Sequence, residues 1–155
     1  SSHMRIFVFG DMLGIQDMRR IIKSIRETMP HFLAEVAFDF IDVFLHPRMI
    51  SYRNRLPAGC AESNMSIALF ARLVCHELLP ANVERAIALD LGDIIVFDDI
   101  LGLWMEGDRL EPDQLFAVAS HRAYEEAWRH AKPSMLNGGV VLYEVSRMRQ
   151  SNYTE

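Results

Sequence analysis

The chain has 155 residues, of which 50% are hydrophobic and 24% are charged, and its formal net charge is −5. This length and composition are typical of one globular α/β domain, and the negative charge argues against nucleic acid or an anionic membrane as the main partner. No apolar run is long enough to cross a membrane, and the two cysteines lack the spacing of a metal site. Ser1-Ser2-His3 before Met4 is typical of an expression-tag remnant.

The first part of the chain alternates apolar runs with a helical pattern. Arg5 to Phe9 is a short run of β-forming residues closed by Gly10-Asp11, which predicts a strand. From Ile15 to Met29 the apolar residues recur at three- and four-residue steps, which predicts an amphipathic helix that Pro30 ends. A second strand is expected from Val36 to Phe44. Two aspartates interrupt it, so we expect it nearer a sheet edge than the first strand.

An irregular stretch is expected from His46 to Ala61, because it contains two prolines and a glycine. It also carries three arginines, which are either exposed to solvent or contacts for a phosphate or sugar acid: Arg48, Arg53 and Arg55. Ser63 is placed to cap a following helix that extends to about Leu79.

The central stretch from Arg85 to Trp104 contains two apolar runs separated by an acidic segment. Ala86 to Leu89 precedes Asp90-Leu91-Gly92-Asp93, and Ile94 to Phe97 follows it. An apolar run bounded by turn residues predicts a buried strand, and a short helix ending near Trp104 is expected next. Carboxylates at the C-terminal end of a strand lie where open α/β sheets bind ligands, and a cation offsets their repulsion. The alternative is an acidic turn with a purely structural role.

The remaining residues continue the alternation of strands and helices. The sequence predicts a strand over Leu115 to Ser120 and a helix over Tyr124 to Lys132. Asn137-Gly138-Gly139 is typical of a turn that leads into a strand over Val140 to Tyr143, and Ser146 to Gln150 begins a last helix. Such alternation predicts an α/β fold with a mainly parallel sheet, helices on both faces, and the polar residues after each strand along one rim.

Four stretches occur in an order and spacing that resemble one enzyme family. They are Phe40-Ile41-Asp42-Val43, Ala71-Arg72-Leu73, the segment ending in RAIALDLGDIIVFDDILGLW, and Met135 to Val140 followed by Met148-Arg149. Together they resemble the family 8 glycosyltransferases, which are retaining enzymes of the Rossmann-like GT-A fold that use nucleotide sugars. The xyloside and glucoside xylosyltransferases are the nearest subgroup, chiefly from LNGGVVLYEVSRMR.

The resemblance implies a metal site at the acidic segment. In that family an Asp-x-Asp motif holds manganese and the donor diphosphate, which implies Asp90 and Asp93 as ligands of Mn²⁺ or Mg²⁺ here. Hard oxygen ligands suit such a cation, which neutralises the departing nucleoside diphosphate. The spacing in this chain is one residue wider than in the family. Either Gly92 replaces the second aspartate and a ligand is lost, or glycine allows a bulge that brings both carboxylates onto one cation.

The same resemblance implies a donor-binding role for four further residues. Arg72 would contact the donor sugar, Asn137 and Gly138 would line its pocket, and Asn64 falls where some members carry a donor-contacting histidine. A surface ion pair is the alternative for Arg72, and a turn position is the alternative for Asn137. The residues identify no catalytic nucleophile or general base.

The function implied is transfer of a sugar (xylose, glucose or galactose) from a UDP-sugar to a glycan or glycoside acceptor with retention of configuration. Nothing before Arg5 supplies the family's first strand, and its later motifs are absent, so residues 4–155 are expected to form a GT-A-like domain incomplete at both ends. These departures favour a second hypothesis, a non-catalytic GT-A-like domain that binds a sugar nucleotide weakly or acts as a scaffold.

Overall fold

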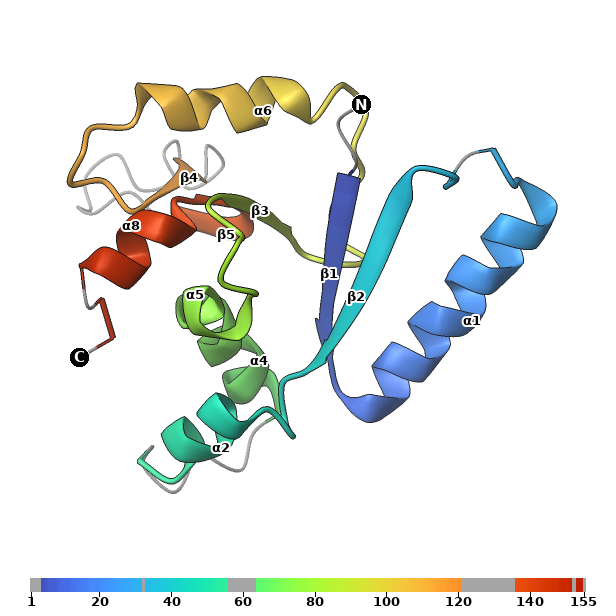
Figure 1. Ribbon diagram of the computed structural model, residues 1–155, viewed down its shortest axis with the longest axis horizontal. Coiled ribbons are helices and arrows are strands. Elements are labelled where there is room, and N and C mark those ends of the chain that lie inside the picture. Colours follow the sequence, from blue (N-terminus) through green and yellow to red (C-terminus); the bar gives the residue numbers. More distant parts are fainter. Residues whose placement is uncertain (1–3, 32, 56–63, 121–135, 152, 155) are drawn as a thin grey trace, which may run out of the picture. The chain divides into compact units, whose positions relative to one another are not determined.

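The computed structural model describes residues 4–31, 33–55, 64–120, 136–151 and 153–154 (Figure 1). The chain divides into two compact units, Ser1–Leu79 and Pro80–Glu155, and each has its own sheet. Among the described residues, no helix is both long enough and apolar enough to cross a membrane.

The first unit opens with the predicted strand, helix and strand. β1 (Met4–Gly10) and β2 (Val36–Asp42) form a parallel pair, and α1 (Met12–Thr28) connects them (Figure 1). The helix begins at Asp11, whose carboxylate accepts a hydrogen bond from the Gly14 N–H at 2.7 Å. Within the described residues β1 and β2 pair only with each other, so each lies at a sheet edge, and the expectation that β2 lies nearer an edge than β1 stays a prediction.

Both aspartates that interrupt β2 have structural partners. Asp39 pairs with Arg5 of β1 at 2.6 Å, and this hydrogen bond lowers the pKa of the Asp39 carboxyl below its usual range. Asp42 accepts hydrogen bonds from the main-chain N–H groups of Phe44 and Leu45 at 2.9 and 3.1 Å. A short side chain that bonds its own backbone two or three residues on favours a turn, so β2 ends at Asp42.

The stretch predicted to be irregular contains a helix, α2 (Pro47–Arg53), so that prediction is wrong for these residues. Proline suits a first helical position, because the N–H that it lacks has no partner inside the helix. The His46 imidazole accepts from the Arg48 N–H at 3.3 Å, and Met49 is buried. Arg53 and Arg55 are exposed, and residues 56–63, including Ser63, lie outside the described part of the chain.

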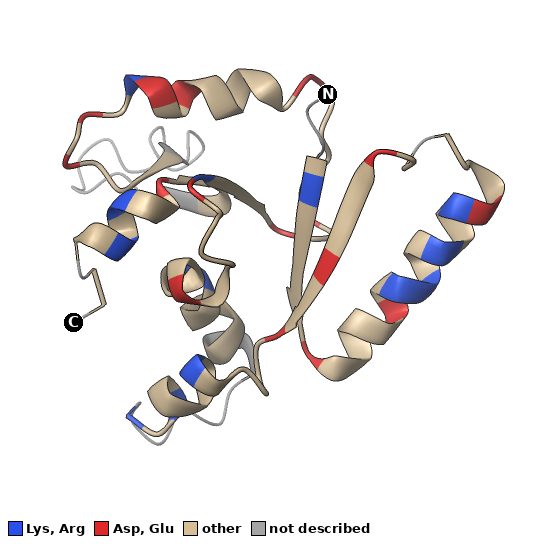
Figure 2. Ribbon diagram, in the orientation of Figure 1, with Lys and Arg blue, Asp and Glu red and all other residues tan. Residues whose placement is uncertain are grey.

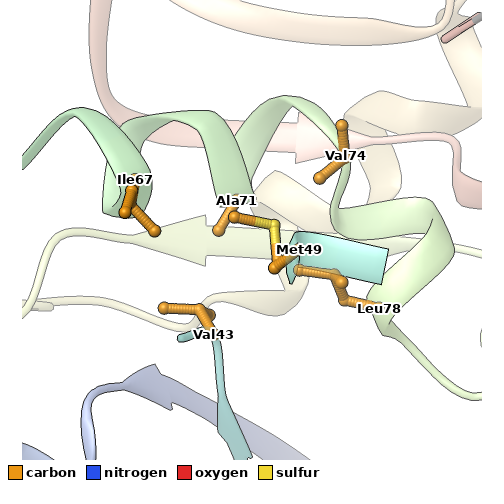
Figure 3. Packing of buried hydrophobic residues seen from close by; sticks show 6 residues of the cluster. All are labelled: Val43, Met49, Ile67, Ala71, Val74 and Leu78. Atoms are coloured by element: carbon orange, nitrogen blue, oxygen red, sulfur yellow. The ribbon is translucent and has the colours of Figure 1, made fainter. Parts of the chain in front are cut away.

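The predicted helix to Leu79 is two helices, α4 (Asn64–Leu73) and α5 (Cys75–Leu78), with a break at Val74. Both helices and α2 contribute to the hydrophobic core of the first unit (Figure 3). Six buried side chains converge there: Val43, Met49, Ile67, Ala71, Val74 and Leu78. Because Val74 is only 1% exposed, the break itself is part of the core.

The second unit contains an antiparallel sheet. β3 (Ala86–Leu89), β5 (Leu136–Tyr143) and β4 (Phe116–Ser120) lie in the order β3-β5-β4, and both pairings are antiparallel. The expectation of mainly parallel strands is therefore confirmed for β1 and β2 but wrong for this sheet. A parallel pair needs a long crossover, whereas an antiparallel pair forms whenever the chain returns beside itself. The helix predicted over residues 124–132 lies outside the described part of the chain.

The run Ile94 to Phe97 is not a strand, contrary to the pattern of its residues. Phe97 is 92% exposed and Ile95 is 74% exposed. The run follows the turn that ends β3, so it has left the sheet. A short helix near Trp104 is confirmed as α6 (Leu101–Glu106), where the Asp99 carboxylate accepts from the Leu101 N–H at 2.9 Å.

Two further short helices lie in the described part of the second unit. η1 (Gly107–Arg109) continues directly from α6, and α8 (Val145–Gln150) follows β5. Val145 and Met148 of α8 are fully buried, which explains why this short helix is fixed in place.

Candidate functional site

The acidic segment after β3 forms a tight turn that depends on Gly92. The Asp93 N–H donates to the Asp90 carbonyl at 3.4 Å, and Gly92 has φ of 94°. A turn of this kind needs a positive φ at its third residue, a conformation that glycine adopts without strain. The extra residue is therefore accommodated by a turn, and the two aspartates stand at its first and last positions. Their main chains approach within about 7 Å in such a turn.

This turn lies against the glycine pair of β5. In the sheet register Leu89 is opposite Val140, and the Asp90 N–H extends the ladder by donating to the Gly139 carbonyl at 2.9 Å. Asn137-Gly138-Gly139 belongs to β5, so the prediction of a turn at this segment is wrong. A Cβ added to Gly138 would meet no atom within 4 Å, so packing within the described residues does not require glycine there.

Asn137 lies two residues before Gly139, whose carbonyl accepts the hydrogen bond from the Asp90 N–H. It is opposite Ala119 of β4, next to a shift of register between Val118 and Ala119. The second unit thus brings the acidic turn and the Asn137-Gly138-Gly139 segment to the same end of the sheet.

Arg72 and Asn64 both belong to α4 in the first unit. Asn64 is the first residue of the helix, and the half-buried Arg72 lies in its last turn. Eight residues of α-helix cover about 12 Å, so these two residues mark opposite ends of α4. Their contact with a donor sugar stays a prediction.

The turn offers a metal ion two carboxylate ligands, the half-buried Asp90 and the exposed Asp93. The described residues contain no group of three or more histidine, cysteine or acidic side chains that could hold a metal ion. Structural zinc needs about four protein ligands, and this turn does not fit it. Mg²⁺-like cations keep several waters and are commonly held by one or two carboxylates together with substrate phosphates, which this turn does fit.

An ion-pair cluster that the sequence did not predict holds the opposite end of β3. The Arg85 Nε donates to the buried Glu144 at 2.5 Å, and its Nη1 donates to Asp108 and to the Trp104 carbonyl, both at 2.9 Å. Burial lowers the pKa of the Arg85 guanidinium, but its hydrogen bonds to Asp108 and Glu144 outweigh burial and raise that pKa above its ordinary value. Gly107 leaves the space for Arg85, because a Cβ there would lie 2.4 Å from Arg85 Cζ.

Two arginines of α8 bind main-chain carbonyls of the loops beside the sheet. Arg147 Nη1 donates to the carbonyls of Glu111 and Gln114 at 2.8 and 3.2 Å. Arg149 belongs to the Met148-Arg149 pair of the family resemblance. It donates to the Ala81 and Val83 carbonyls at 3.1 and 2.9 Å. In this structure Arg149 therefore fixes the loop that leads into β3.

Substituting Gly92 by alanine is expected to destabilise the second unit by about 1–2 kcal/mol, because a non-glycine residue must hold a strained positive φ. Urea denaturation followed by circular dichroism measures the change. Gly102→Ala is the matched control: a Cβ at Gly102 meets nothing within 4 Å, and this residue in α6 has no positive φ. An equal midpoint for Gly92→Ala and wild type would contradict the turn geometry.

Comparison with solved structures shows which fold the chain has. The chain superposes on mouse xyloside xylosyltransferase 1 with a TM-score of 0.61 and 18% identity, covering 96% of this chain and 56% of that one. It superposes on the galactosyltransferase LgtC, solved with donor and acceptor sugar analogues, with a TM-score of 0.53 and 19% identity, covering 95% and 60%. The fold is that of the GT-A glycosyltransferases. The pattern of glycosyl transferase family 8 matches residues 13–155, and the chain belongs to that family.

Two curated relatives come from Arabidopsis thaliana. The probable galacturonosyltransferase-like 4 protein is 30% identical over 149 residues, and the probable galacturonosyltransferase-like 3 protein is 26% identical over 152 residues. The alignments cover 87% and 89% of this chain, which spans 40% of the length of each relative.

Proposed function

We propose that this protein takes part in the transfer of a sugar from a UDP-sugar to a glycan acceptor, with retention of configuration. In this proposal Asp90 and Asp93 hold Mn²⁺ or Mg²⁺ together with the donor diphosphate. The observation that carries it is the acidic turn fixed against Gly139 at one end of the sheet, in a chain that belongs to glycosyl transferase family 8.

The chemistry of the turn supports this role. A bound cation would neutralise the negative charge that develops on the departing nucleoside diphosphate. Asp90 and Asp93 supply two hard oxygen ligands on one tight turn, and the diphosphate and water would supply the others. None of the described residues would contact a Cβ at Gly138, which would let a donor approach the main chain closely there. Arg72 and Asn137 remain the proposed contacts of the donor sugar.

The sugar is proposed only as a class. The names of the similar proteins refer to galacturonosyl, xylosyl and galactosyl transfer. We infer a pentose, a hexose or a hexuronic acid as the transferred group, because these sugars differ around C4 and C5, away from the anomeric carbon, and would share the diphosphate and metal contacts.

Thermal unfolding with UDP and manganese tests the proposal. UDP with Mn²⁺ is expected to raise the midpoint, because a ligand at 100 times its Kd stabilises the folded state by about 2.7 kcal/mol. UDP with a chelator and Mn²⁺ alone are the controls, and each is expected to give a much smaller shift. No shift with millimolar UDP and Mn²⁺ would contradict donor binding and favour a scaffold role. Release of UDP from a UDP-sugar in the presence of glycan acceptors then separates transfer from binding.

A further inference from the structure

A basic ridge lies along one side of α1, directly over β2. Arg19, Lys23 and Arg26 recur at four- and three-residue steps, so they share one helix face. With Ile22 and Glu27 of the same helix and Phe38 and Phe40 of β2, they line a groove of about 310 Å³, in which Lys23 Nζ lies 3.8 Å from Glu27 Oε1. Figure 2 shows the basic residues gathered along this helix in a chain whose net charge is −5.

The two arginines of this ridge are held in place by aromatic rings. Arg19 Cζ lies 4.7 Å from the centre of the Phe40 ring, and Arg26 Cζ lies 5.6 Å from the centre of the Phe38 ring. Within the described residues neither guanidinium has a carboxylate partner, whereas the neighbouring Arg20 pairs with Asp17 at 3.0 Å. A guanidinium held against a ring loses less conformational freedom when it binds a carboxylate, so it is preorganised for such a partner.

The ridge also reaches the main chain of an edge strand. Both aromatic partners belong to β2 and neither to β1, so the ridge overlies β2. The Arg26 Nη2 donates to the Val36 carbonyl at 3.2 Å. Within the described residues β2 pairs with β1 alone, which leaves its other edge without a strand. Such an edge is a template on which an extended segment can pair.

We propose that the basic ridge and the edge of β2 together form a docking site for an extended acidic peptide segment of a partner protein. The segment would add to β2 through main-chain hydrogen bonds. Its acidic side chains would contact Arg19 and Arg26, and would compete with Glu27 for Lys23. In an extended strand, side chains on the same face lie about 7 Å apart. Along α1 the successive basic residues lie about 6 and 4.5 Å apart, so their long side chains can reach acidic side chains at the strand spacing. The ridge belongs to the first unit and the acidic turn to the second, and the proposal does not depend on sugar transfer.

The test is a titration of the full chain with a short synthetic peptide that alternates valine and glutamate, followed by calorimetry and by amide chemical shifts. Saturable binding that weakens with salt is expected, with the largest shifts in β2. The double variant Arg19→Gln, Arg26→Gln should bind about tenfold more weakly, because it loses two exposed charge-assisted contacts. Arg20→Gln is the matched control on the same helix, and it should leave the affinity unchanged.

Peptide variants keep the test decisive if the protein variants are poorly folded. Replacing glutamate by lysine should abolish binding, and methylation of alternate main-chain nitrogens should do the same, because it blocks strand pairing. Equal affinity for the methylated peptide would overturn the proposal. Absence of binding at millimolar peptide would also overturn the proposal. So would a result in which an oligouronate binds, and binds more weakly to the double variant, while the peptide does not bind.

Discussion

Replacing Arg85 by methionine is expected to lower the free energy of unfolding by about 3–5 kcal/mol, because it leaves a buried carboxylate without its main partner. The side chain of Glu144 is 7% exposed, and Arg85 Nε is its nearest cation at 2.5 Å. Arg147 Nε lies 3.7 Å from the other Glu144 oxygen and should place the loss at the lower end of this range. Urea denaturation at neutral pH measures the difference.

Asp108 provides the matched control for Arg85. Its carboxylate contacts the same guanidinium at 2.9 Å, but its side chain is 69% exposed. Water solvates an exposed carboxylate in the folded state, so Asp108→Asn should cost no more than about 1 kcal/mol. A double variant, Arg85→Met with Glu144→Leu, should recover most of the loss, because no charge is then buried alone. If Arg85→Met unfolds at the same urea concentration as wild type, Glu144 does not depend on Arg85.

The parts of the fold that local patterns encode could be predicted from the sequence. The recurrence of apolar residues between Ile15 and Met29 identifies α1, of which Ile15 and Ile22 are the buried positions. The sequence did not predict α2, because two prolines and a glycine in its segment indicated an irregular stretch. One proline there is at the first helical position, where it favours a helix, and the buried Met49 fixes the segment to the core.

Strand direction has no local signature. β3, β4 and β5 have the apolar runs that a buried strand of either direction shows, so the alternation with helices predicted a parallel sheet. Direction depends on where the chain returns, and β5 returns between the two earlier strands. The run Ile94 to Phe97 has the composition of a strand and none of its pairing, because the Gly92 turn has already taken the chain out of the ladder.

The candidate site also contains one feature that the local sequence predicts and one that it does not. The Asp90-to-Asp93 turn could be anticipated, because a glycine between two aspartates is a local signal for a positive φ. The Arg85–Glu144 pair could not, since 59 residues separate its members and each looks like an ordinary surface charge in the sequence. A signal was present in the sheet pattern: once β3 and β5 are paired, Arg85 and Glu144 directly flank the Ala86–Tyr143 pair.

Replacing either Asp90 or Asp93 by asparagine is expected to weaken manganese-dependent binding of UDP by about 100-fold, because changes that only reorient metal ligands already cost about 10- to 100-fold. Asparagine keeps the size of each side chain and removes one negative charge, so the turn itself should persist. Titration of UDP into protein with saturating Mn²⁺ measures the affinity, and thermal unfolding without ligand shows whether each variant is folded.

Asp98→Asn is the matched control for this pair. Asp98 is an exposed acid of the same segment, five residues beyond Asp93, and its carboxylate accepts a hydrogen bond from the neighbouring Asp99 N–H at 2.7 Å. Its substitution should leave UDP affinity unchanged. If Asp90→Asn loses affinity and Asp93→Asn keeps it, Gly92 stands where the family has its second ligand, and the two-carboxylate site is wrong. If all three variants bind equally well, the cation is held elsewhere in the protein, because a metal ligand cannot lose its charge without a change in affinity.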